Sequence, residues 1–166
     1  MRQEADLPYA HVMRPAFPIL LLPILAAMPA LAGCDRAPPE PQVTVEHAVA
    51  TLPALPGRPG AAYFTLRTNA GPTRLTGVGS PRIGRIELHE TASAGGVATM
   101  RPLEHAVFAP DEPLVFAPGG RHAMLFDLDA ALRPGDTVRL TFAFDSAPSV
   151  TAEAEVRPPG DHGAAH

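Results

Sequence analysis

The sequence predicts an all-β domain, an antiparallel sandwich or barrel, on three observations. Apolar and polar residues alternate over short segments, as they do in strands that bury one face. Turn sequences such as Arg133-Pro134-Gly135-Asp136 separate these segments at short, fairly even intervals. Proline takes 21 of the 166 positions, against about 5% in average proteins, and no apolar stripe has helical spacing. We therefore expect at most one short helical turn.

Nine segments carry the strand pattern. The alternation is clearest in residues 43–49 and 61–68, which a turn-rich loop separates. The other segments are shorter or follow breaks that contain glycine and proline. They are residues 74–78, 85–91, 97–101, 114–116, 122–128, 137–144 and 150–156.

The N-terminal segment has the features of a lipoprotein signal peptide. Residues 16–32 are apolar throughout, but prolines interrupt them and they fall short of the about 20 residues that a membrane-spanning helix needs. They end in Leu31-Ala32-Gly33-Cys34, which resembles the bacterial lipobox, where signal peptidase cuts before a cysteine that carries lipid. An incidental cysteine after an ordinary signal peptide is the alternative. Since Glu4 and Asp6 suit a positive n-region poorly, Met13 is an alternative start.

The chain divides into four parts on this interpretation. Lipidation of Cys34 would anchor the protein to a membrane on the periplasmic side. Asp35 resembles the signal that retains enteric lipoproteins in the inner membrane. The parts are residues 1–33, the signal peptide; 34–42, the lipidated cysteine and a proline-rich tether; 43–157, the folded domain; and 158–166, a flexible tail with two histidines.

Charge and residue types exclude several function classes. The 13 basic residues are all arginine and are outnumbered by 17 acidic ones, so we expect no cationic surface for nucleic acid. One cysteine cannot form a Cys-rich zinc site or a CxxC redox pair. No serine lies in a G-x-S-x-G elbow, no Walker lysine is present, and Asp127 and Asp129 lack the other EF-hand ligands. We expect no enzymatic activity.

Two histidines and two methionines can form a copper site. His122 and Met124 are two residues apart and project from the same face of a strand. His89 lies on the polar face of its segment, and the break at Gly95-Gly96 can return Met100 toward it. Imidazoles and thioethers suit Cu(I) and suit Zn, Mg or Ca poorly. Core packing of methionine and hydrogen bonding of a lone histidine remain the alternative interpretation.

The spacing of these four residues, H-x10-M-x21-H-x-M, resembles the copper-binding motif of the periplasmic PCuAC copper chaperone family. The likeness covers about residues 43–157 and includes Glu87-Leu88-His89-Glu90, Met100-Arg101-Pro102 and the segment 118–125. The resemblance implies a cupredoxin-like β-sandwich that holds Cu(I) at an exposed site. It also implies delivery to the CuA centre in subunit II of cytochrome c oxidase, alongside Sco-type thiol proteins. The ligands it implies are His89, Met100, His122 and Met124.

Several alternatives stay open. Glu90, beside the first histidine of the motif, either orients that imidazole or is a solvated carboxylate. His162 and His166 either assist capture of Cu(II) or belong to a frayed polar terminus. We expect His47 and His105 to be ordinary strand or turn residues. The competing functions are a periplasmic copper buffer or resistance protein, and a non-metal β-sandwich lipoprotein that acts as an interaction module.

Overall fold

A computed structural model describes residues 42–94 and 96–162 of the chain. The predicted signal peptide, Cys34, the rest of the predicted tether up to residue 41, and residues 163–166 of the predicted tail lie outside these residues. The described part is all-β, as predicted, and it has ten strands. They are β1 (Val43–Thr51), β2 (Gly60–Thr68), β3 (Thr73–Gly79), β4 (Ile83–Ala94), β5 (Val97–Pro102), β6 (Ala106–Phe108), β7 (Leu114–Phe116), β8 (Arg121–Leu128), β9 (Thr137–Phe144) and β10 (Val150–Arg157).

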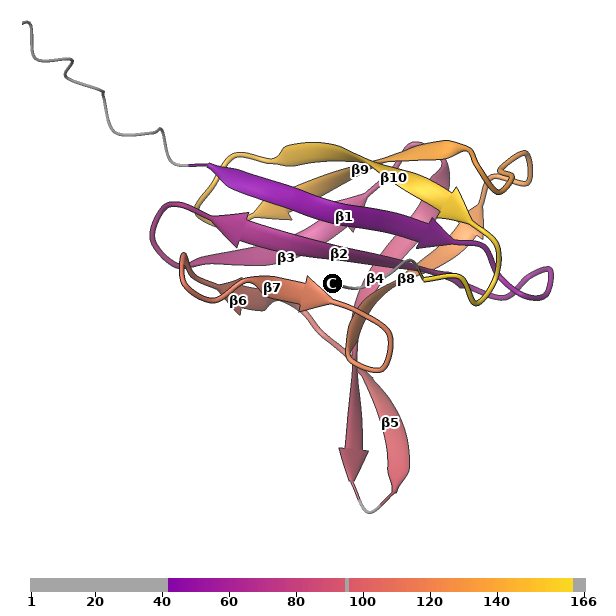
Figure 1. Cartoon of the computed structure of the whole chain (residues 1–166), viewed down its shortest axis with the longest axis horizontal. Helices are drawn as coiled ribbons and strands as arrows, with labels where there is room; N and C mark the ends of the chain where they lie inside the picture. Colours follow the sequence, from indigo (N-terminus) through magenta and orange to yellow (C-terminus); the bar gives the residue numbers. More distant parts are fainter. Residues whose placement is uncertain (1–41, 95, 163–166) are drawn as a thin grey trace, which may run out of the picture. The chain divides into compact units, whose positions relative to one another are not determined.

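The strands form one curled sheet. Their order is β5-β4-β8-β2-β1-β10-β9-β3-β6, and β7 pairs with β2. The sheet curls on itself, so that β3 lies against β4 near the opposite end of the order (Figure 1). Every pairing is antiparallel except that of β1 with β10, which is parallel. The sheet is therefore mixed, whereas the sequence predicted an antiparallel one.

The core consists of side chains from alternate positions on the strands. In β2, Phe64 and Leu66 are buried, and β9 buries Phe142 in the same way. The Phe64 ring stacks on Phe116 with centroids 4.4 Å apart and meets Phe142 edge-on at 4.8 Å. These aromatic contacts join the strands across the interior, since paired aromatic rings pack favourably in such geometries.

The strands that carry the motif lie together at one end of the sheet. β4 pairs with β8 along its first half and with β5 along its second half. The second half of β4 and β5 project from the body as a two-stranded hairpin (Figure 1). Because β5 has no other partner strand among the described residues, the residues on its far edge are open to solvent, as the exposed Thr99, Met100 and Arg101 show.

Candidate metal centre

Strand register places the four motif residues on one face of β5-β4-β8. His89 on β4 lies directly opposite His122 on β8, and Met124 follows two residues later. Met100 on β5 lies opposite Thr91, which is two residues from His89. Opposed residues in an antiparallel pair, and residues two apart on a strand, project to the same side. The register thus places all four residues that the sequence singled out on one face, with Met100 and Met124 on opposite sides of the His89–His122 pair along the strands.

The two imidazoles are close enough to bind one ion. Their ring centroids are 6.0 Å apart and the ring planes are tilted by 31°. With metal–nitrogen bonds of about 2.0–2.1 Å and each nitrogen about 1.2 Å from its ring centre, two bridged imidazoles have centroids at most about 6.5 Å apart. The observed separation lies inside this limit. The separation of the two rings is therefore compatible with one ion bound between them.

One nitrogen of each imidazole is held by the protein. Nδ1 of His122 lies 3.1 Å from the carbonyl oxygen of Gly120 and donates to it, which leaves Nε2 with a free lone pair. Nε2 of His89 lies 3.1 Å from a carboxylate oxygen of Glu87, while Nδ1 of His89 is buried without a hydrogen-bond partner. A buried polar atom without a partner is rare and calls for an explanation. Metal binding would satisfy it.

The four residues differ in exposure. The His89 side chain is only 15% exposed, although it projects away from the core as the alternation predicted. Met100, on the projecting hairpin, is 58% exposed. His122 and Met124 are half-buried. Solvent therefore reaches Met100 but reaches the two histidines only in part. The sequence analysis expected an exposed site, and this face is less exposed than that.

Glu90 does not orient His89. It accepts hydrogen bonds from the Nε and Nη2 of Arg101 at 3.2 and 2.7 Å and pairs with Nε of Arg121 at 3.4 Å. The hydrogen bond from Arg101 holds the pKa of the Glu90 carboxyl below its usual value, against the effect of partial desolvation. Neighbouring residues on a strand face opposite sides, so Glu90 points away from the face that carries the four motif residues. The carboxylate that does contact His89 is Glu87, which the sequence analysis did not single out.

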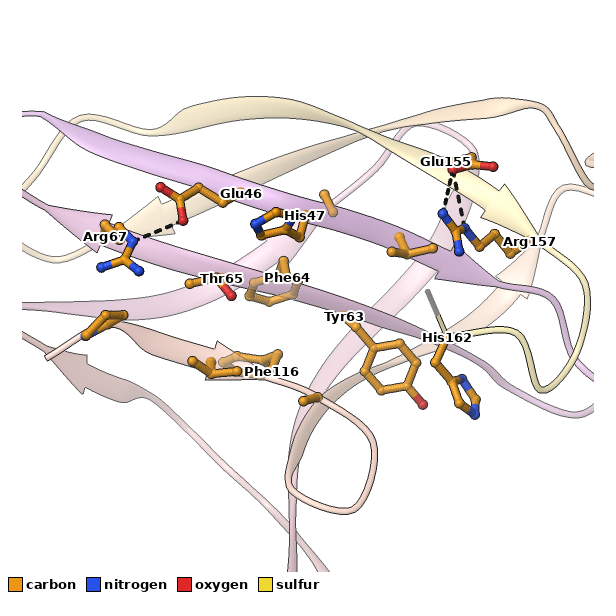
Figure 2. Close-up of a pocket in the computed structure, with 15 residues that line it drawn as sticks. Glu46, His47, Tyr63, Phe64, Thr65, Arg67, Phe116, Glu155, Arg157 and His162 are labelled. Atoms are coloured by element: carbon orange, nitrogen blue, oxygen red, sulfur yellow. Dashed lines mark hydrogen bonds and ion pairs between the residues drawn. The ribbon is translucent and has the colours of Figure 1, made fainter. Parts of the chain in front are cut away.

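The other histidines lie outside this face. His47 and His105 are exposed, and His47 has a φ of 54° at a bulge between β1 and β2. His162 packs edge-on against Tyr63 with ring centroids 5.1 Å apart. His47, Tyr63 and His162 line an open groove of about 520 Å³ over β1 and β2, in which none of the four motif residues takes part (Figure 2).

The described residues, 42–94 and 96–162, contain no helix that could span a membrane. They also hold no group of three or more His, Cys, Asp and Glu side chains placed to bind a metal ion. Asp129, which lacks the other EF-hand ligands in the sequence, pairs with Nε of Arg82 at 3.0 Å.

Comparisons with known families and sequences extend this picture. The model of the family described as "Putative lipoprotein LpqE-like" matches residues 43–156. The chain is 38% identical over 87 residues to "Uncharacterized protein RP573" of Rickettsia prowazekii (strain Madrid E), covering 51% of this chain and 48% of that protein. It is 33% identical over 78 residues to "Putative lipoprotein Lxx21020" of Leifsonia xyli subsp. xyli, covering 46% and 47%. The chain thus spans about half the length of these relatives.

Solved structures with the same fold include two that are described by their copper state. The apo PCuAC domain of PmoF2 superposes with a TM-score of 0.61 at 25% identity, covering 74% of this chain and 94% of that one. The Cu(I) form of DR1885 from Deinococcus radiodurans gives a TM-score of 0.55 at 26% identity, covering 77% and 85%. The described fold is therefore that of PCuAC domains.

Proposed function

Because the chain belongs to the LpqE-like family, which its match over residues 43–156 shows, and has the fold of PCuAC domains, we propose that it is a Cu(I) chaperone of the bacterial envelope. In this proposal His89, Met100, His122 and Met124 hold the ion. The observation that carries the proposal is their placement on one face of β5-β4-β8, with imidazole centroids 6.0 Å apart.

The donor set favours Cu(I) as cargo. Two neutral imidazoles and two neutral thioethers form a borderline-to-soft set without charge, which suits Cu(I) better than Zn, Mg or Ca. A blue-copper electron-transfer centre needs a thiolate, and the only cysteine of the chain is Cys34, which we assign to the lipid anchor. Copper is thus carried by this domain and is not a redox cofactor of it.

Exposure suggests the order of ligand exchange. Met100 is the most open of the four ligands at 58% exposed, while His89 is 15% exposed. A ligand of the acceptor can therefore replace the thioether of Met100 first, while the two imidazoles still hold the ion. Thioethers are weaker donors than thiolates, so transfer toward a cysteine-rich acceptor is favourable. The CuA site of cytochrome c oxidase subunit II, reached directly or through a Sco-type protein, is the acceptor we propose.

Location follows from the family and the lipobox. Lipidation of Cys34 would tether the domain to the periplasmic side of the membrane, and Asp35 would direct it to the inner membrane. Globomycin, which blocks lipoprotein signal peptidase, should make an uncleaved precursor of higher mass accumulate, and Cys34→Ala should abolish labelling of the protein by radioactive palmitate. Palmitate labelling of Cys34→Ala equal to that of the wild type would contradict the lipid anchor.

Copper binding is tested by stoichiometry and ligand type. Competition with a chromophoric Cu(I) chelator should give one Cu(I) per chain, and X-ray absorption should show two nitrogen and two sulfur neighbours. His122→Ala should weaken binding, whereas His105→Ala, an exposed histidine outside the site, should leave it unchanged. Absence of stoichiometric Cu(I) uptake would overturn the proposal in favour of a non-metal interaction module.

Delivery is tested in cells. Deletion of the gene should lower cytochrome c oxidase activity, and added copper should restore it, because a chaperone is dispensable when its cargo is abundant. A copper buffer or resistance protein predicts the opposite pattern, which is copper sensitivity with normal oxidase activity. That pattern would overturn the chaperone proposal and retain Cu(I) binding.

A further inference from the structure

A chain of contacts ends at His89 on the face of β5-β4-β8 that carries the four proposed ligands. We call this face the copper face. The guanidinium carbon of Arg85 lies 4.1 Å from the ring centroid of Phe126. Nη1 of Arg85 pairs with Oε1 of Glu87, and Oε2 of Glu87 lies 3.1 Å from Nε2 of His89. Each residue in this series thus contacts the next.

The strand geometry explains why these residues meet. Arg85, Glu87 and His89 are successive alternate positions on β4, so their side chains share one face. Phe126 lies directly opposite Arg85 in the pairing of β4 with β8. A guanidinium stacks well on an aromatic face and still presents its N–H groups at the edge. Phe126 therefore holds Arg85 in a position from which it can fix the Glu87 carboxylate.

The carboxylate determines which nitrogen of His89 carries the proton. An ionised carboxylate only accepts hydrogen bonds, so Nε2 of His89 must be the N–H donor in the neutral ring. Nδ1 then carries the lone pair, and it is this atom that is buried without a partner. His122 has the reverse arrangement, because its Nδ1 donates to the carbonyl of Gly120. The two histidines thus offer different atoms to a metal.

We propose that Arg85 and Glu87, supported by Phe126, are positioning residues that make Nδ1 of His89 a nitrogen ligand, beside Nε2 of His122, whose Nδ1 is held by the carbonyl of Gly120. This inference rests on the proposed Cu(I) site and assigns a role to residues outside it. A carboxylate on the distal nitrogen orients a metal-binding imidazole and makes it a stronger donor. Loss of such a partner typically weakens metal affinity by about 10- to 100-fold.

The chain offers a matched control. Glu90 is adjacent to His89 in sequence and is also paired with arginine, but it lies on the opposite face of β4. Glu90→Gln therefore removes a nearby negative charge without touching the imidazole. The Glu87 side chain is 38% exposed, so Glu87→Ala leaves the core intact. Arg85→Gln is a second variant, which keeps the Glu87 carboxylate but removes the arginine that pairs with it.

The first measurement uses the copper-free protein. Long-range nitrogen–proton NMR at pH 8 on the ¹⁵N-histidine-labelled chain should show His89 with its proton on Nε2 and His122 with its proton on Nδ1. Glu87→Ala should convert His89 to a mixture of tautomers, Arg85→Gln should do so partly, and Glu90→Gln should leave the wild-type signals. An unchanged His89 tautomer in Glu87→Ala would overturn the inference.

The second measurement is Cu(I) affinity by chelator competition. Glu87→Ala should bind Cu(I) about 10- to 100-fold more weakly than wild type, and Glu90→Gln should bind within about threefold of it. Equal weakening in both variants would also overturn the inference, because it would indicate a general effect of charge. If the wild type takes up no Cu(I) while the tautomer of His89 responds as expected, the proposed function fails and the tautomer assignment stands.

Discussion

Replacement of Met100 by leucine should weaken Cu(I) binding without changing the stability of the fold. The side chain is 58% exposed on the projecting β4–β5 hairpin, and leucine has a similar volume. Substitutions at such surface positions change the free energy of unfolding by less than about 0.5 kcal/mol. For a domain of this size that corresponds to a shift in Tm of less than about 3 °C.

The effect on copper should be much larger. Met100→Leu removes one of four proposed ligands and keeps the bulk of the side chain. Since loss of an outer-shell partner alone costs about 10- to 100-fold in metal affinity, loss of a direct ligand should cost at least about 10-fold. X-ray absorption of the Cu(I)-loaded variant should show one sulfur neighbour where the wild type shows two.

Val107→Leu is the matched control for this experiment. Val107 is 60% exposed on β6, away from the copper face, so it should change neither Tm nor Cu(I) affinity. Chelator competition and thermal unfolding of the three proteins separate binding from folding. Wild-type Cu(I) affinity in Met100→Leu would refute the assignment of Met100 as a ligand and the exchange order that begins with it.

Three further predictions concern the fold. Leu66→Ala should lower the free energy of unfolding by about 2–5 kcal/mol in urea titrations, because Leu66 is 0% exposed and leaves a cavity. Gly84→Ala should lower it by about 1 kcal/mol or more, because the added Cβ would lie 2.9 Å from the Cβ of Asp127. Asp145 accepts hydrogen bonds from Arg74, which hold its carboxyl pKa well below the usual value. The stability advantage of wild type over Asp145→Asn should therefore be complete above the unfolded-state pKa of about 3.9 and decline as the pH falls below it.

Each of these predictions has a result that contradicts it. A loss below about 1 kcal/mol in Leu66→Ala would indicate that the strands collapse into the cavity. Gly77 has no atom within 4 Å of an added Cβ, so equal losses in Gly77→Ala and Gly84→Ala would dismiss the close approach as the cause. A difference between wild type and Asp145→Asn that stays constant from pH 6 to pH 2.5 would show that ionisation of Asp145 is irrelevant.

Strand positions were predictable because alternation is a local property. Residues 114–116 and 137–144 coincide with β7 and β9, and residues 43–49 fall within β1. β6 was missed, since the three residues Ala106–Phe108 are too few to show a period of two. The parallel pairing of β1 with β10 was also missed, because residues far apart in the chain meet there and no turn sequence marks the pairing.

The sequence by itself determined the strand class and the four candidate ligands, since their types and spacing can be read along the chain. Only the tertiary structure decided which carboxylate serves His89. Glu90 is the nearer residue in sequence, but it faces the opposite side of β4 and pairs with Arg101 and Arg121. Glu87 is two residues away, shares the face of His89 and is held there by Arg85. The physical reason is the pleat of the strand, which alternates side chains, together with the pairing to β8, which supplies contacts that the linear chain does not contain.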